Sequence, residues 1–340
     1  MVKKCYGFFM LRTLLLSIAT LSLLISSLWA ILALWYQAPG GLPGRLLWGA
    51  AWSLGMVVCL YWLWSGQYVW YALLGYLLLF AVLLMWWSGI KPSLHRDWAD
   101  DLAYITTGEI NGHRIRLDNV RNFVWRTADD YDIHWESREY DLRRLQSVDM
   151  ITSTWGIDSI AHVLVSFGFD GGEHVAFSVE IRREENESFS EIGGFFKQFE
   201  LSIIAADERD VVRVRSNVRG EDLWLYRINL SDADARELFR SFVTQANQLA
   251  QEPRFYHTIT GNCTTIVYSM MKKIVEGLPL DYRLLLTGYL DTYVYEVGGM
   301  VPGASLTELQ QRGHITQRAL AADKATDFSA RIRQGVPGWD

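Results

Sequence analysis

The sequence predicts three membrane-spanning helices followed by an exported α+β domain, and three observations support this fold class. Residues 13–36, 46–64 and 68–87 are uncharged and mainly apolar, and each is long enough to cross a hydrocarbon core of about 30 Å. Alternating apolar segments follow and predict strands. From Ser231 the apolar period becomes helical. The net charge of −6 and the mean hydropathy of +0.06 average these two unlike parts.

Basic residues before the first span predict the membrane topology. Lys3, Lys4 and Arg12 precede that span, whereas the loop after it carries only Arg45. Positive charge is retained on the cytoplasmic side, so we expect a cytoplasmic N-terminus and, after three crossings, export of residues 90–340. The alternative interpretation is a cleaved signal peptide, but the apolar stretch exceeds the short core of a signal peptide and two more spans follow it.

The chain divides into four predicted parts. Residues 1–88 form a three-span anchor, 89–155 a β-rich lead-in segment, 156–310 the main α+β domain and 311–340 a polar C-terminal tail. The exported part contains no internal repeat or low-complexity tract, and its length suits one domain with a lead-in segment.

Turn signals and alternating apolar residues predict the strands of the exported part. Asn111-Gly112 lies between two alternating segments, which is the strongest short signal of a β-hairpin. Two further strands, 162–169 and 174–182, flank the turn Asp170-Gly171-Gly172. Another pair is predicted at 199–206 and 210–216, with the charged residues 207–210 at the bend.

Two helices are predicted after the strands. Ser231 is a suitable N-cap for a helix that ends at Pro253, and a second helix begins near Asn262 and ends at Gly277. The apolar residues of the first helix recur at helical spacing: Ala235, Leu238, Phe239, Phe242, Val243, Ala246 and Leu249.

Cys263 is the only cysteine in the exported part, and it stands at the predicted start of the second helix. Cys5 lies before the first span and Cys59 lies within the second, so neither can pair with it. The helix dipole favours a thiolate, and the backbone at Asn262, Cys263 and Thr264 is where an oxyanion would be stabilised. The alternative is an inert, buried cysteine.

A nucleophilic thiol needs a general base, and the chain has seven histidines. His257 lies in the loop six residues before Cys263 and is expected to be a surface or packing residue. His162 and His174 lie on predicted strands. The others fall in the lead-in segment, a charged stretch or the tail: His95, His113, His134 and His314.

Strand parity favours His162 as the base. A three-residue hairpin loop pairs Phe169 with Glu173 and places His162 directly opposite Glu180. His174 then lies at the turn, about 20 Å along the ladder at about 3.4 Å per residue. Glu180 is suited to orient the imidazole and to stabilise the imidazolium, as the third member of a catalytic triad does.

Other interpretations of the charged residues stay open at this point. Glu180 would otherwise form a surface salt bridge with Arg182 or Arg183. The charged cluster Glu208, Arg209 and Asp210 is either a structural ion network or part of a site for the acceptor substrate, and the same question applies to Arg182.

A family resemblance agrees with these candidate residues. The exported part contains, in order, a His-led strand, "SVEIRRE", "ADERD" and "NCTT", preceded by "KPSLHRDWADDLA" and followed by "DYRLLLTGYLD". Over roughly residues 90–310 this pattern closely resembles the Lnb N-terminal periplasmic domain family, named for a bacterial lipoprotein N-acyltransferase. The resemblance implies that residues 156–310 form an Lnb-type domain.

The resemblance also implies a circularly permuted papain-like fold, similar to the NlpC-type and lecithin:retinol acyltransferase groups. In this fold the histidine strand precedes the cysteine helix, and helices pack on an antiparallel sheet. Carried over to this sequence, the family pattern assigns the base to His162, the acidic strand residue to Glu180 and the nucleophile to Cys263.

The first functional hypothesis is therefore a membrane-anchored cysteine acyltransferase on the periplasmic side of the bacterial cytoplasmic (inner) membrane. Cys263 would take an acyl chain from a phospholipid as a thioester and pass it to the N-terminal amine of a lipoprotein. We expect no cofactor and no nucleic-acid partner. We also expect no metal, because neither the scattered histidines nor the single exported cysteine matches a zinc spacing.

Two other hypotheses compete with this one. A periplasmic cysteine peptidase or amidase acting on cell-wall peptides would present a polar cleft around Cys263, whereas a lipid enzyme would present an apolar surface. A non-catalytic membrane scaffold would have Cys263 buried or far from His162. The oligomeric state does not follow from the sequence.

Overall fold

The computed structural model describes the backbone of residues 2–339 and the side chains of residues 10–339. The side chains of Lys3, Lys4 and Cys5 therefore lie outside the described residues. The chain forms two compact units. One comprises residues 1–92 and 191–198, and the other comprises residues 93–190 and 199–340.

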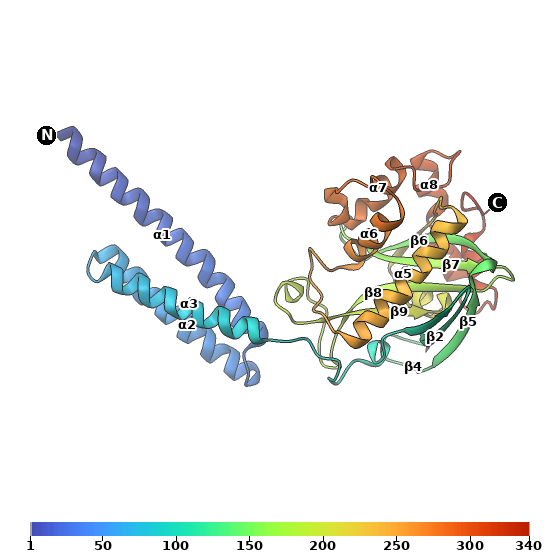
Figure 1. The fold of residues 1–340 in the computed structure, drawn as a ribbon, viewed down its shortest axis with the longest axis horizontal. Helices are drawn as coiled ribbons and strands as arrows, with labels where there is room; N and C mark the ends of the chain where they lie inside the picture. Colours follow the sequence, from blue (N-terminus) through green and yellow to red (C-terminus); the bar gives the residue numbers. More distant parts are fainter. Residues whose placement is uncertain (1, 340) are drawn as a thin grey trace. The chain divides into compact units, whose positions relative to one another are not determined.

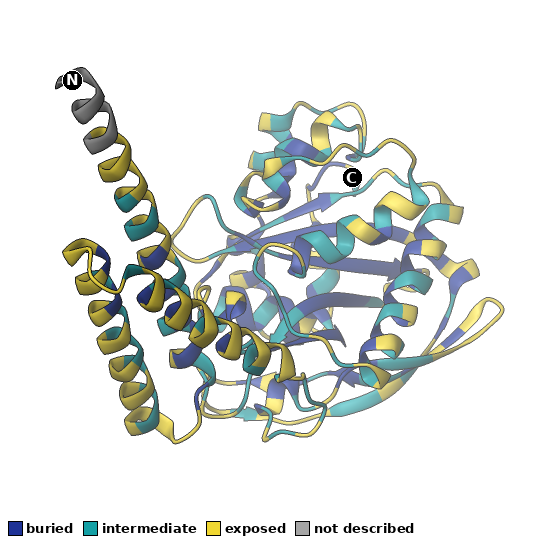
Figure 2. Cartoon of the chain, turned by 60° about the vertical axis from the view of Figure 1, so that its left-hand side comes forward, coloured by how far each residue is buried: buried dark blue, intermediate teal, exposed yellow. Residues whose placement is uncertain are grey.

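The first unit contains three long apolar helices (Figure 1). They are α1 (Val2–Gln37), α2 (Gly41–Ser65) and α3 (Val69–Gly89). In length and composition, Met10–Gln37, Gly41–Ser65 and Val69–Gly89 are suited to cross a membrane, so the three predicted apolar helices are present. Most of their surface is exposed (Figure 2), as expected for helices whose apolar side chains face lipid.

A segment far along the chain completes this membrane unit. Phe196 stacks on Tyr36 with ring centroids 5.6 Å apart, and Gln37 Nε2 donates to the Phe196 carbonyl over 2.9 Å. Lys197 Nζ donates to the carbonyl of Trp87, near the end of α3, over 2.7 Å. Residues 191–198 therefore pack on the C-terminal ends of α1 and α3.

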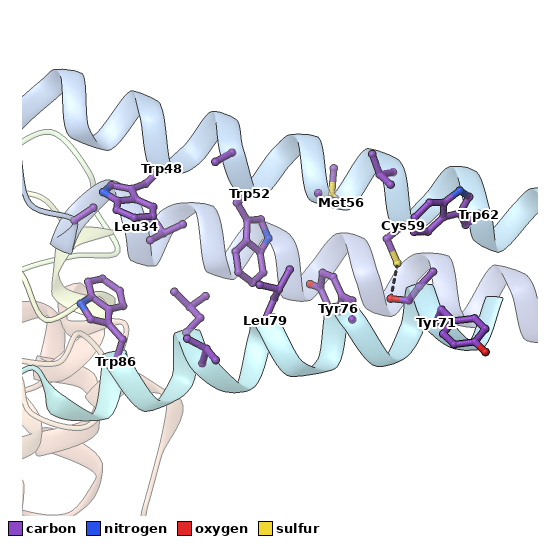
Figure 3. A pocket seen from close by; sticks show the side chains of 18 of the residues that line it. Leu34, Trp48, Trp52, Met56, Cys59, Trp62, Tyr71, Tyr76, Leu79 and Trp86 are labelled. Carbon is purple, nitrogen blue, oxygen red and sulfur yellow. Dashed lines mark hydrogen bonds between the residues drawn. The ribbon is translucent and has the colours of Figure 1, made fainter. Parts of the chain in front are cut away.

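An open cavity of about 660 Å³ lies among the three helices (Figure 3). Its lining is almost entirely apolar and aromatic and includes Trp48, Trp52, Tyr76 and Trp86. Cys59 also lines it, and its thiol donates to the carbonyl of Ala72 over 3.5 Å. Cys59 is thus one of the residues between the membrane helices.

The second unit is built on an eight-stranded sheet with the order β1-β2-β9-β8-β7-β6-β10, in which β5 also pairs with β2 (Figure 1). All pairings are antiparallel except that of β2 with β9. The strands are β1 (Thr107–Asn111), β2 (Arg114–Arg121), β5 (Trp135–Asp141), β6 (Leu145–Thr154), β7 (His162–Phe169), β8 (His174–Arg182), β9 (Glu200–Ala206) and β10 (Asp222–Arg227). A separate small sheet joins β3 (Val124–Trp125) to β4 (Tyr131–Asp132).

Both hairpins predicted from turn residues are present. Asn111 pairs with Arg114 across Gly112, whose φ of +61° is readily adopted by glycine. At the second hairpin Leu164 pairs with Ser178 and Gly168 pairs with His174. Loop length and side-chain alternation therefore predicted the register correctly.

Helices cover both faces of this sheet. The long helix α5 (Asp232–Gln251) begins after the N-cap Ser231, and all seven of its predicted apolar residues are buried. With α6 (Cys263–Ile274) it shares a core with Val165, Phe167 and Phe177 of the central strands. Side chains of opposite parity, such as Leu164 and Ala176, belong to a second core.

The predicted polar tail, 311–340, is instead part of this second core. It contains the end of α8 (Leu306–Gly313), α9 (Thr316–Ala321) and α10 (Phe328–Arg333). Ile315, Phe328 and Ile332 are fully buried against the sheet. Its few apolar residues are spaced widely among charged ones, so the sequence did not reveal the buried face.

Two other expectations also differ from the structure. Residues 210–216 form no strand but belong to α4 (Glu208–Arg213) and a π-helix (Val214–Val218), because Asp207 caps a helix by accepting from the Arg209 amide. The predicted lead-in segment is not separate from the main domain either. Its strand β2 pairs with β9, and β6 pairs with β7. A short helix, α7 (Leu290–Glu296), lies between α6 and α8.

Candidate active site

Cys263 is the first residue of α6, and the preceding Asn262 is the N-cap. Asn262 Oδ1 accepts from the amides of Thr264 and Thr265 over 3.0 and 2.8 Å, and Thr265 Oγ1 accepts from the Asn262 amide over 3.0 Å. This capping box fixes where the helix begins. It therefore fixes the position of the thiol.

The same cap corrects the expectation that Thr264 offers an amide to an oxyanion. The Thr264 amide is already occupied by Asn262 Oδ1, and Asn262 Nδ2 donates to the Thr258 carbonyl over 2.7 Å. Asn262 and Thr264 thus build the helix start. Of the three residues named from the sequence, Cys263 is the one whose amide takes no part in this cap.

His162 begins β7, and Glu180 lies near the end of β8. Continuing the observed register by two residues from the pair Leu164 and Ser178 places His162 directly opposite Glu180. His162 Nε2 lies 3.2 Å from Glu180 Oε1. The hairpin therefore places His162 opposite Glu180, as side-chain alternation predicted.

Ser178 completes the contacts of the imidazole, although it was not among the predicted site residues. Its Oγ donates to Glu180 Oε1 over 2.6 Å and lies 2.7 Å from His162 Nε2. Because the single hydroxyl hydrogen goes to Glu180, Ser178 Oγ accepts from Nε2–H. These contacts involve Nε2, and His162 also interacts with the Cys263 thiol.

The charges of this group reinforce one another. Burial and the charge of Arg215 oppose the imidazolium, but the charge of Glu180 and the hydrogen bonds to Cys263 and Glu180 raise the pKa of His162 to about 9. Burial likewise opposes the thiolate, but hydrogen bonding and charge interaction with His162 lower the pKa of Cys263 below its usual range. The two shifts favour a thiolate–imidazolium pair at neutral pH.

Glu180 stays ionised although it is partly buried. The charge and hydrogen bond of His162, the charge of Arg215 and the hydrogen bond from Ser178 outweigh desolvation and hold the pKa of Glu180 well below its usual range. A negative charge is therefore fixed beside Nε2 of the imidazole.

Arg215 was not predicted to belong to this site. It lies on the π-helix, and its Nη2 is 3.2 Å from Glu180 Oε1 while its Nη1 is 3.1 Å from Glu221 Oε2. Glu221 in turn accepts from Ser153. Arg215 and Glu221 are far from Glu180 in sequence, so strand parity gave no signal for either residue, whereas Ser178 shares the predicted face of His162.

His174 and His257 lie in other surroundings. His174 pairs with Gly168 at the turn end of the hairpin, and its Nδ1 contacts the Gly172 carbonyl over 3.0 Å. His257 Nδ1 accepts from the amides of Ile259 and Thr260, each over 3.3 Å. It shapes the loop before α6.

The charged cluster 207–210 is a structural network. Asp210 binds Arg121 over 2.8 Å and accepts from the Phe123 amide and from Trp125 Nε1. Glu208 binds Arg333, which also binds Asp149. Glu208, Asp210 and Asp149 are fully buried, and although burial opposes ionisation, Arg333 leads the interactions that lower the pKa of Glu208 to about 2.

Arg182 and Arg209 are the two other charged residues considered for an acceptor site. Arg182 is buried, donates to the carbonyls of Leu102 and Ala103 and lies over the ring of Trp98. Arg209 is exposed on α4. Of the four charges considered for an acceptor site, Arg182, Glu208 and Asp210 therefore stabilise the fold.

Comparison with known proteins gives one result. Residues 131–288 match the model of the Lnb N-terminal periplasmic domain, a range that contains His162, Glu180 and Cys263. No match was found among curated proteins or solved structures. Together with the three apolar helices, the match indicates a membrane protein with a periplasmic segment. Within residues 131–288, the chain is therefore similar to the Lnb N-terminal periplasmic domain family.

Proposed function

We propose that this protein is a membrane-anchored thiol acyltransferase in which Cys263 is the nucleophile, His162 the acid and base, and Glu180 the residue that orients the imidazole. One observation carries the proposal: a thiol at a helix start interacts with an imidazole that also contacts a partly buried carboxylate. The chain order of His162, Glu180 and Cys263 also fits a circularly permuted papain-like fold.

In the first half of the reaction, the Cys263 thiolate attacks the ester carbonyl of a phospholipid. The oxygen of the tetrahedral intermediate becomes negative, and the Cys263 amide at the positive end of α6 is suited to stabilise it. The C–O bond then breaks, and the His162 imidazolium gives its proton to the leaving alkoxide. A lysophospholipid leaves, and the acyl chain stays on Cys263 as a thioester.

In the second half, the N-terminal amine of a lipoprotein attacks the thioester carbonyl. Neutral His162 accepts the proton from the amine, the C–S bond breaks, and Cys263 leaves as a thiolate. The product is an amide, and the thiolate–imidazolium pair is restored. Glu180 stabilises the imidazolium at the start and at the end of the cycle.

The proposed orientation places the N-terminus in the cytoplasm and residues 90–340 in the periplasm of the bacterial inner membrane. The basic residues before the first span support this orientation. Both proposed substrates are held at a membrane surface, so three spans would keep the enzyme where its substrates are.

The proposal is tested by trapping the intermediate. The full chain in lipid nanodiscs is incubated with phospholipid carrying isotopically labelled acyl chains, and the Cys263 peptide is analysed by mass spectrometry. We expect a labelled adduct that hydroxylamine removes, present in Cys59→Ala and absent in Cys263→Ala. In cells, lipoprotein N-termini should lack the amide-linked acyl chain when the protein carries Cys263→Ala, but not when it carries Cys59→Ala. Absence of both the adduct and the change in lipoproteins would refute the transferase proposal.

A further inference from the structure

Exposed apolar side chains are concentrated in two segments of the second unit, 155–161 and 280–289. We call them the apolar rim, and its large exposed side chains are Trp155, Ile157, Leu280, Tyr282, Leu285, Leu286 and Tyr289. Leu280 is 84% exposed. Contiguous exposed apolar surface is uncommon on soluble domains and marks a surface that binds a partner or a membrane.

The two segments are joined to each other directly beside His162. Thr287 Oγ1 accepts from the Ala161 amide over 2.7 Å and donates to the Ala161 carbonyl over 2.6 Å, and Ala161 precedes His162 in the chain. The Gly288 amide donates to the Ser159 carbonyl over 3.0 Å. A Cβ at Gly288 would lie 1.9 Å from the Asp158 carbonyl oxygen, so the backbones approach too closely for any other residue. The apolar rim therefore lies next to the candidate active site.

The chemistry of the apolar rim fits a bilayer surface. Trp and Tyr combine an apolar ring with a polar group and are enriched where hydrocarbon meets the headgroups. The charges of the second segment are paired, because Arg283 binds Asp281 over 2.8 Å and Glu296 over 2.7 Å. An unpaired charge on the apolar rim would oppose entry of the rim into the headgroup region of the bilayer.

A residue that contacts the apolar rim lies close in sequence to the membrane unit. Phe189, which is 52% exposed, packs edge-on against Trp155 of the rim with ring centroids 6.2 Å apart. Two residues later the chain enters the membrane unit, whose segment 191–198 packs on the ends of α1 and α3. Phe189, which contacts the rim, is therefore two residues from the segment that packs on the helix ends.

We propose that the apolar rim docks into the surface of the lipid bilayer and presents the candidate active site to membrane lipid. This docking proposal deepens the proposed function. It rests on that function only in the experiment that measures acyl transfer. It assigns the lipid bilayer, rather than a peptide or a second copy of the chain, as the partner of this surface.

Fluorescence quenching tests the docking without using the chemistry. In the full chain, Cys5, Cys59 and Cys263 are replaced by Ala, and an environment-sensitive fluorophore is attached at Leu280→Cys or at Ile133→Cys. Ile133 is a matched control, because it is an apolar residue, 54% exposed and outside the rim. The proteins are reconstituted in phosphatidylcholine and phosphatidylglycerol vesicles with lipid-borne nitroxide or aqueous iodide as the quencher.

We expect the label at 280 to be quenched by lipid-borne nitroxide and protected from iodide, and the label at 133 to show the reverse. A label at 280 that iodide quenches as strongly as the label at 133 overturns the proposal. Protection at 280 from both quenchers also overturns it, because a protein surface then covers the rim.

A second measurement links docking to function. In the chain with native cysteines, Leu280→Asp is expected to slow formation of the labelled Cys263 adduct about tenfold, as expected when one leucine loses its burial in lipid, whereas Ile133→Asp leaves the rate unchanged. Equal rates in the two variants contradict the role of docking. If the unaltered chain forms no adduct, the acyl transfer proposal fails, and the quenching result still decides whether the rim binds lipid.

Discussion

Glu180→Gln is the sharpest test of the charges in the candidate active site. The substitution keeps the size of the side chain and an oxygen that accepts hydrogen bonds, but it removes the negative charge beside His162. Glu173→Gln is a matched control, because Glu173 lies exposed at the turn of the same hairpin. Any difference between the two variants therefore reports the position of the carboxylate rather than the net charge.

The expected size of the effect follows from the geometry. For the 3.2 Å between Glu180 Oε1 and His162 Nε2, Coulomb's law with an effective dielectric constant of about 20 gives about 5 kcal/mol. Lowering the pKa of His162 from about 9 to its ordinary value of about 6.5 requires about 3 kcal/mol, so losing this one charge is sufficient. Burial and Arg215, which both oppose the imidazolium, would lower that pKa further.

The sign of the pH dependence follows from these shifts. The pKa of His162 is raised and that of Cys263 is lowered, so the thiolate–imidazolium pair is favoured at pH values up to about 9, above which His162 loses its proton. In Glu180→Gln the imidazole is neutral at pH 7, and the thiolate loses its cationic partner. We expect alkylation of Cys263 by iodoacetamide at pH 7 to slow about tenfold or more.

The assay follows alkylation of the Cys263 peptide by mass spectrometry from pH 5 to 10, using the full chain in detergent. Thermal denaturation of each variant checks that it is folded. If Glu180→Gln and Glu173→Gln react with the pH profile of the unaltered chain, Glu180 does not set the charge of the pair. The assignment of Glu180 to the site would then be wrong.

The remaining predictions concern other parts of the molecule. His162→Ala should raise the pKa of Cys263 only part of the way to its usual value, since the helix dipole remains, and should abolish acyl transfer; an unchanged thiol titration would contradict this. A reporter fused after Asp340 should be active only outside the cytoplasm, and cytoplasmic activity would refute the proposed topology. Arg333→Met leaves two buried carboxylates unpaired and should lower the free energy of unfolding by about 3–5 kcal/mol, whereas exposed Arg331→Met should change it by about 0.5 kcal/mol or less; equal melting temperatures would contradict this. Asn262→Ala should cost about 1 kcal/mol in the same melting assay, and Asn262→Asp should restore most of it if the cap is as described.

The sequence by itself determined the features that depend on local patterns. Three uncharged apolar segments predicted the three long helices, because a membrane span is defined by length and composition. The seven apolar residues after Ser231 were all buried on α5. The three-residue loop after Phe169 set the register of the hairpin, and side-chain alternation then placed His162 opposite Glu180. In each case one short segment contains the whole signal.

Only the tertiary structure decided which distant residues surround these elements. Arg215 reaches Glu180 because residues 210–218 continue as a helix and a π-helix, although their alternating valines predict a strand. Arg333 neutralises Asp149 and Glu208 from a segment that reads as a polar tail. Burial removes water from these charged groups, so each needs a partner of opposite sign. The fold decides which residue is that partner. A single sequence gives the charges, but it does not give their pairing.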